Sequence, residues 1–264
     1  MLDVDRQTVM AWLGKLLGGT LGFMFGGPLG MIAGIAFGHL FDKADEFEHT
    51  DRPAYRTQGS RDSTQMMFFV GAFSMVARVA QADGEVTSSE RASIERFIDE
   101  RLRLGMSEHA AAMRVFDAAL VGGGTFDQFA AQFYENFATS SGLLQLMIEF
   151  FYEVAVADGT INSSEEALIR RAAQLFHIPD YVADAIRRRY GGSSAGGHAY
   201  AVLNLSPTAT DEEVKKAYRK MCIEFHPDTL ASKGMGEEFK AAAERKFQEI
   251  QEAYEEIKKD RGIK

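Results

Sequence analysis

The chain has 264 residues, of which 46% are hydrophobic and 25% charged, and its formal net charge is −9. This length suffices for about two domains, and the balance of apolar and charged residues excludes wholesale disorder. The negative charge argues against general nucleic-acid binding, which requires a basic surface, and the single cysteine, Cys222, excludes an intrachain disulfide.

The first expected element is a transmembrane helix at about residues 16–38, inside an N-terminal segment 1–41. This stretch contains no charged residue, and as a helix at ~1.5 Å per residue it would extend about 35 Å, enough to cross a bilayer. A secretory signal peptide is disfavoured because its apolar region is shorter and precedes a small-residue cleavage site. A buried helix of a soluble domain is disfavoured because each interior glycine would cost it about 1 kcal/mol in water.

Seven glycines recur at four-residue intervals in this segment and would form one stripe along the helix. Overlapping GxxxG motifs of this kind let helix backbones approach closely in lipid. We therefore expect self-association, giving a homodimer, with a kink at Pro28. The stripe consists of Gly14, Gly18, Gly22, Gly26, Gly30, Gly34 and Gly38.

Basic residues near the two ends predict the orientation of the helix. Those before it are Arg6 and Lys15, and those after it are Lys43, Arg52, Arg56 and Arg61. The excess after the helix favours a cytoplasmic C-terminal side, with the N-terminus outside. Residues 42–61 are polar and are expected to form a juxtamembrane linker.

Residues 62–190 show helical periodicity almost throughout and predict an α-helical bundle. The bundle contains an internal repeat, because residues 79–90 (VAQADGEVTSSE) and 154–165 (VAVADGTINSSE) are identical at 8 of 12 positions. In each copy we expect a helix to end at Asp-Gly and the next helix to open with a capping box. A pseudo-symmetric arrangement would bring the two acidic turns near one another.

The repeat resembles the TerB domain, a helical bundle of the tellurite-resistance type in which such acidic turns have been linked to metal. The resemblance implies candidate oxygen ligands for calcium or magnesium. Capping and turn formation is the competing interpretation, because the spacing does not match an EF-hand loop. The candidate ligands are Asp83, Glu85, Glu90, Asp158, Glu165 and Glu166.

A Gly/Ser-rich stretch at 191–198 predicts a flexible linker. The last domain, 199–264, is therefore expected to move relative to the bundle while staying close to it. Its periodicity predicts two longer helices with facing apolar stripes, which would pack as an antiparallel hairpin with His226-Pro227-Asp228 at its tip. The expected order is a short helix at 200–203, a helix at 211–225, a loop at 229–236 and a long helix at about 237–259.

One side of the helix at 211–225 is basic. A charged helix face is most often simply solvated, so the charges alone do not identify a binding surface. The basic residues are Lys215, Lys216, Arg219 and Lys220, and the apolar Ile223 lies near the centre of this face.

The tripeptide and its flanks, EEVKKAYRKMCIEFHPD before it and AAAERKFQEIQEAYEEIKKD after it, resemble the J domain, through which DnaJ-type co-chaperones engage DnaK-type ATPase chaperones. The resemblance implies that the basic face meets an acidic patch of the partner, with Ile223 as an added contact. It also implies that docking of the tripeptide favours ATP hydrolysis by the partner, so that no catalytic residue, cofactor or enzyme activity belongs to this chain. The sequence departs from the common J-domain pattern at Glu224 and Thr229.

An N-terminal glycine-striped anchor, a TerB-like bundle and a C-terminal J module, in this order, resemble the DjlA type of membrane-anchored bacterial co-chaperone. The resemblance implies an all-α protein that crosses the bacterial inner membrane once, holds the bulk of its chain in the cytoplasm and recruits a DnaK-type chaperone there. A competing hypothesis is a membrane-bound metal or stress sensor that acts through the bundle and uses the J module as its effector.

Overall fold

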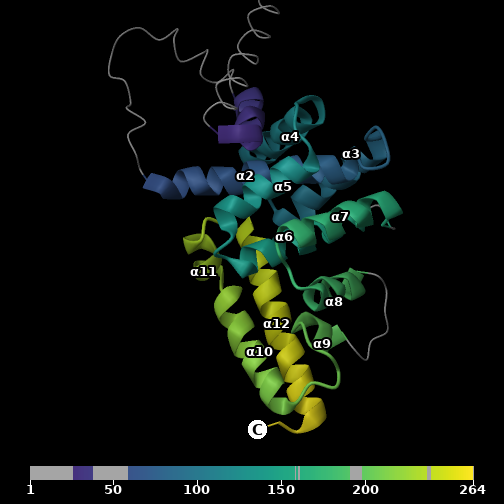
Figure 1. The fold of residues 1–264 in the computed structure, drawn as a ribbon, viewed down its shortest axis with the longest axis vertical. Helices are drawn as coiled ribbons and strands as arrows, with labels where there is room; N and C mark the ends of the chain where they lie inside the picture. Colours follow the sequence, from purple (N-terminus) through teal and green to yellow (C-terminus); the bar gives the residue numbers. More distant parts are fainter. Residues whose placement is uncertain are drawn as a thin grey trace, which may run out of the picture.

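The computed structural model describes residues 26–37, 59–157, 159, 161–190, 198–236 and 239–263. All regular elements in these ranges are helices, which confirms the all-α class (Figure 1). Most of the two predicted linkers lies outside the described residues. At the end of the first linker, helix α2 begins at Gly59, three residues before the predicted start of the bundle.

Part of the predicted transmembrane helix, 26–37, is described and is helical. Leu29, Ile32 and Ala36 on one side of it are buried against the bundle, and the Leu29 N–H donates to Gln132 Oε1 at 2.9 Å. Within the described ranges, no helix is both long and apolar enough to cross a membrane. The glycines of the stripe that lie outside the described residues are Gly14, Gly18, Gly22 and Gly38.

Two helical stretches of the bundle are apolar on nearly every side and form its centre, because a helix without a polar face must be covered all round. They are α6 and the part of α2 from Phe68 to Ala80, and their buried residues belong to one continuous apolar core. The elements of the bundle are α2 (Gly59–Ala80), α3 (Ser88–Phe97), the π-helix η2 (Ile98–Leu102), α4 (Met106–Val121), α5 (Phe126–Phe137), α6 (Ser141–Ala155), α7 (Ser163–Leu175) and α8 (Asp180–Tyr190).

The internal repeat forms the structure expected of it. Thr87 caps α3 and Asn162 caps α7, each in a full capping box with the glutamate three residues later. The turn glycines Gly84 and Gly159 have φ of 149° and 121°, values that glycine adopts without strain. The two turns meet, since Asn162 Nδ2 donates to Asp83 Oδ2 at 3.0 Å.

The last domain contains α9 (His198–Val202), α10 (Asp211–Glu224), α11 (Pro227–Ser232) and α12 (Lys240–Arg261). Helices α10 and α12 lie side by side as the expected antiparallel hairpin (Figure 1). The rings of Tyr218 and Tyr254 stack between them at 3.9 Å. The predicted loop at 229–236 is wrong in its first half, where α11 stands, because Pro227 at the first helical position favours a helix start.

The last domain packs against the bundle. Leu230, Met235, Phe239 and Ala243 are buried in the same apolar core as α2 and α6. The rest of the last domain has a separate small core between α9, α10 and the C-terminal half of α12. In Figure 1, α12 runs from the bundle to the far end of the molecule. The last domain lies close to the bundle, as expected, and its movement relative to the bundle stays a prediction.

Candidate functional site

The tripeptide forms the start of α11. His226 is the N-cap residue, with φ −60° and ψ 130°, and Pro227 is the first helical residue. His226 Nδ1 accepts a hydrogen bond from the backbone N–H of Asp228 at 3.2 Å, so the proton of the neutral imidazole belongs on Nε2. The ring also packs edge-on against Phe247 of α12, with centroids 5.4 Å apart. Backbone and packing thus hold the imidazole in one orientation.

The polar groups of the tripeptide face solvent. The side chain of His226 is 48% exposed and that of Asp228 is 94% exposed, with 3.8 Å between Nδ1 and Oδ2. A carboxylate this exposed contributes little to the fold through such a pair. It is instead free to accept hydrogen bonds from another molecule.

The predicted basic face lies on the surface of α10 and leads directly to the tripeptide. Lys216, Arg219 and Lys220 are exposed and Lys215 is half-buried, while Ile223 is 68% exposed. Steps of three and four residues place these side chains on one continuous strip of the helix. Together the strip and the tripeptide make a surface with positive charge, one apolar side chain and one carboxylate.

The far end of the hairpin is fixed by Arg261. Its guanidinium donates to the hydroxyl of Tyr200 at 2.6 Å and to the carbonyl oxygens of Ala209 at 2.6 Å and Pro207 at 2.7 Å. This ties the end of α12 to α9 and to the loop before α10. No pattern in the sequence indicates this role, because an arginine in the last turn of a helix is expected there for the helix dipole alone.

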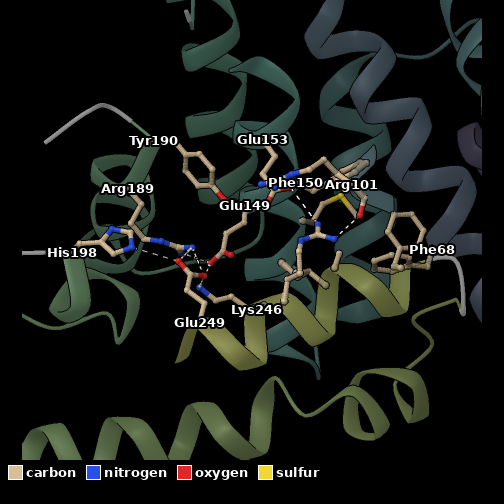
Figure 2. Close-up of a pocket in the computed structure, with 15 residues that line it drawn as sticks. Phe68, Arg101, Glu149, Phe150, Glu153, Arg189, Tyr190, His198, Lys246 and Glu249 are labelled. Carbon is tan, nitrogen blue, oxygen red and sulfur yellow. Dashed lines mark hydrogen bonds and ion pairs between the residues drawn. The ribbon is translucent and has the colours of Figure 1, made fainter. Parts of the chain in front are cut away.

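The end of the hairpin near the tripeptide is fixed by a buried ion cluster (Figure 2). Glu149 of α6 lies 2.8 Å from Arg189 of α8 and 2.8 Å from Lys246 of α12. Glu249 completes the cluster at 2.6 Å from Arg189 and 3.3 Å from Lys246. Burial by itself would raise the pKa of Glu149, but the two cations outweigh it and lower the pKa below the ordinary value. Glu149 is therefore ionised and binds the last domain to the bundle.

A second carboxylate, one turn further along α6, has a different environment. Glu153 lies 3.7 Å from Arg101 and 3.6 Å from Arg245. Burial raises the pKa of Glu153, and these more distant cations offset the effect only in part. A pocket of about 260 Å³ is lined by both carboxylates and by Phe150 and Phe239.

Two members of the ion cluster, Lys246 and Glu149, could have been recognised in the sequence. Lys246 stands between Ala243 and Ile250 at helical spacing, on the apolar stripe of α12. Glu149 stands inside the apolar run of α6. A charge at a position where the pattern requires burial indicates an ion pair.

Most candidate metal ligands of the bundle have other partners. Glu90 accepts from the Thr87 N–H at 2.6 Å, and Glu165 accepts from the Asn162 N–H at 2.9 Å. Glu166 lies 2.6 Å from Arg187. These three carboxylates cap or pair with the bundle itself.

The remaining candidates are Asp83, Glu85 and Asp158. Asp83 is exposed and bonded to Asn162, Glu85 is exposed, and Asp158 lies outside the described residues. In the part of the chain that is described, no three His, Cys, Asp or Glu residues are grouped so as to hold a metal ion. Metal binding by the bundle stays a prediction from the sequence.

Three family models match the chain in succession: the co-chaperone DjlA transmembrane domain over 10–61, tellurite resistance protein TerB over 70–188 and the DnaJ domain over 198–262. Similar proteins include the co-chaperone protein DjlA of Photobacterium profundum, 32% identical over 95% of this chain and 99% of that protein. The chain belongs to the DjlA family. The DjlA proteins of Vibrio cholerae, 33% identical over 95% of this chain and 99% of theirs, and Escherichia coli, 28% identical over 97% and 100%, are further relatives. No solved structure matches it.

Membership of the DjlA family makes this chain a membrane-anchored J-domain co-chaperone. Its J domain implies a DnaK-type chaperone as partner, and its transmembrane domain implies a membrane. These matches do not favour the competing hypothesis of a metal or stress sensor.

Proposed function

We propose that His226, Pro227 and Asp228, together with the basic face of α10, bind the DnaK-type chaperone and stimulate its ATP hydrolysis. The observation that carries this proposal is the exposure of His226 and Asp228 at the N-terminus of α11, directly after the exposed strip of α10. The binding surface comprises Lys215, Lys216, Arg219, Lys220, Ile223, His226, Pro227 and Asp228.

The two parts of this surface have different tasks. The lysines and Arg219 attract an acidic patch of the partner, which speeds encounter and sets orientation, and this effect weakens with salt. The His226 Nε2–H and the Asp228 carboxylate then act through differential affinity for the partner's conformations, because a bound ligand shifts an equilibrium only in that way. Hydrolysis takes place in the partner, and this chain supplies no catalytic group.

The test is the steady-state ATPase rate of the DnaK-type chaperone with the full chain in detergent micelles. We expect His226→Gln and Asp228→Asn to abolish the stimulation. Asp260→Asn, an exposed change of the same chemistry at the far end of α12, is the matched control and should stimulate fully. Stimulation by His226→Gln equal to that of the unmodified chain would refute the assignment.

We also propose that the chain crosses the bacterial inner membrane once, with its N-terminus outside and the bundle and J domain in the cytoplasm. The support is the excess of Lys and Arg on the C-terminal side of the segment 16–38. Residues 26–37 pack on the bundle in the structure, so a helix spanning 16–38 requires this half of the segment to leave the bundle for the bilayer. Proteolysis of spheroplasts should leave the J domain intact, and proteolysis of inverted membrane vesicles should remove it. The reverse pattern would exclude this orientation.

A homodimer through the glycine stripe is a further proposal, supported by the four-residue spacing. Replacing Gly22, Gly26 and Gly30 with leucine should abolish association in a membrane two-hybrid assay. Gly19→Leu lies off the stripe and should leave association unchanged. Equal association of the triple variant and this control would contradict a dimer formed through the stripe.

A further inference from the structure

The bundle touches the J domain on both sides of the tripeptide. Gly142, in the first turn of α6, faces the last residue of α10: a Cβ on Gly142 would lie 2.5 Å from the carbonyl oxygen of Glu224 and 3.2 Å from the Leu230 side chain. Glu224 stands two residues before His226, and Leu230 stands two residues after Asp228. Helix α6 therefore approaches the backbone at the entrance to the tripeptide and a buried side chain just beyond it.

The segment after α11 is held by aromatic packing. Phe239 is 2% exposed, and its ring centroid lies 4.8 Å from that of Phe68, 6.0 Å from that of Phe73 and 5.8 Å from that of Phe150. These three rings come from α2 and α6. The start of α12 is consequently fixed by the bundle and not by the J domain's own core.

Through the ion cluster, the bundle also influences the position of the His226 imidazole. Lys246 is buried against Glu149, while the next residue, Phe247, packs against the ring of His226. Because neighbouring residues of a helix share one backbone, a shift of α12 relative to α6 moves the surface on which His226 rests. Glu149 and Gly142 thus act on the tripeptide from two directions.

The contact leaves the proposed partner surface open. Asp228 is 94% exposed and Ile223 is 68% exposed while the J domain is packed on the bundle. An arrangement that blocked the partner would cover these side chains. The packed arrangement is therefore compatible with binding.

We propose that α6 of the bundle positions the His-Pro-Asp tripeptide, and that the packed arrangement is the form of the J domain that stimulates the partner's ATPase. Gly142 and Glu149 are its positioning residues. The proposal rests on the proposed function of the tripeptide and adds the bundle to the unit that performs it.

The first test is Gly142→Ala in the full chain, because the added methyl group meets a backbone oxygen that cannot turn away. We expect the maximal stimulation of ATP hydrolysis to fall about five- to tenfold, the size of effect that residues outside a binding site have on coupling. The basic face is untouched, so the chain concentration at half-maximal stimulation should change less. Ser141→Ala, an exposed neighbour on the same turn, is the matched control and should behave as the unmodified chain.

The second test locks the packed arrangement and does not depend on Gly142→Ala being folded. Asn204 Nδ2 of the J domain donates to Gln145 Oε1 of α6 at 3.0 Å, so cysteines at these two positions, in a Cys222→Ser background, can be joined by a short bis-maleimide crosslinker. We expect the crosslinked chain to stimulate as well as the same chain before crosslinking.

The outcomes separate this proposal from the proposed function. Loss of stimulation on crosslinking would show that the packed form is inactive and would overturn the proposal. Full stimulation by a folded Gly142→Ala chain, judged by its far-UV circular dichroism, would overturn it as well. A different result would contradict the proposed function: His226→Gln would still stimulate ATP hydrolysis by the partner.

Discussion

Glu149→Gln should lower the free energy of unfolding by about 2–3 kcal/mol at neutral pH. Removing one partner of a buried ion pair costs about 3–5 kcal/mol. The loss is expected at or below the lower limit because Glu249 still faces Arg189 and Lys246 and glutamine keeps the shape and one acceptor. For a domain of this size ~1 kcal/mol corresponds to ~2–4 °C, so the midpoint of thermal unfolding should fall by about 4–12 °C.

The stability lost in Glu149→Gln should depend on pH in a definite direction. The pKa of Glu149 in the folded chain is below its ordinary value of 4.5. Its stabilising effect is therefore present in full above the unfolded-state pKa and is lost as the pH falls through the folded-state pKa. The deficit of Glu149→Gln should be constant from pH 8 to pH 6 and shrink only below about pH 4.5.

Glu153→Gln, one turn away on the same helix, is the matched comparison. The folded-state pKa of Glu153 is raised, chiefly by burial, so any stability that it contributes belongs to low pH and is lost as the pH rises through that pKa. At neutral pH its replacement should cost less than about 1 kcal/mol, because neutralising a charge that burial disfavours removes a penalty.

The assay is urea unfolding of the full chain in detergent, followed by far-UV circular dichroism. Fluorescence is a poor probe of this junction because the one tryptophan, Trp12, belongs to the N-terminal segment. Equal losses of stability in Glu149→Gln and Glu153→Gln at pH 7.5 would refute the electrostatic account of the junction.

Three further predictions concern other contacts. Phe239→Ala should cost about 3–5 kcal/mol in urea unfolding, because it empties a fully buried ring site, and a loss below about 1 kcal/mol would mean that the J domain is not packed there. Thr210→Ala removes the N-cap of α10 and should cost about 1 kcal/mol in the same assay; an unchanged midpoint would contradict this cap. Lys216→Ala combined with Lys220→Ala should raise the chain concentration at half-maximal ATPase stimulation and flatten its salt dependence, whereas Lys259→Ala should change neither.

Local sequence signals predicted the elements around the tripeptide well. Asn162 and Glu165 form the capping box expected before α7, and Thr210 and Glu213 form one of the same pattern before α10. Such caps depend on residues three positions apart, so the sequence alone determines them. The same holds for the exposed position of Ile223 on α10.

The junction could not be predicted in the same way. The stripe on α12 includes Phe239, Ala243 and Ile250, and periodicity shows that these residues are buried without showing against what. In the structure the first two pack on the bundle and the third packs on the J domain's own core. A linker rich in glycine and serine permits movement but does not require it, since packing between the joined domains determines whether they move relative to one another.

The shared core of bundle and J domain has a consequence for how a chaperone meets its clients. A chaperone bound to α10 would not rotate freely relative to the bundle, because Phe239 and Lys246 fix the orientation of the α10–α12 hairpin on the bundle. The rotational entropy that a loosely tethered J domain loses when its partner binds is here removed already when the chain folds. Each recruited chaperone would then be held in the same orientation relative to the bundle.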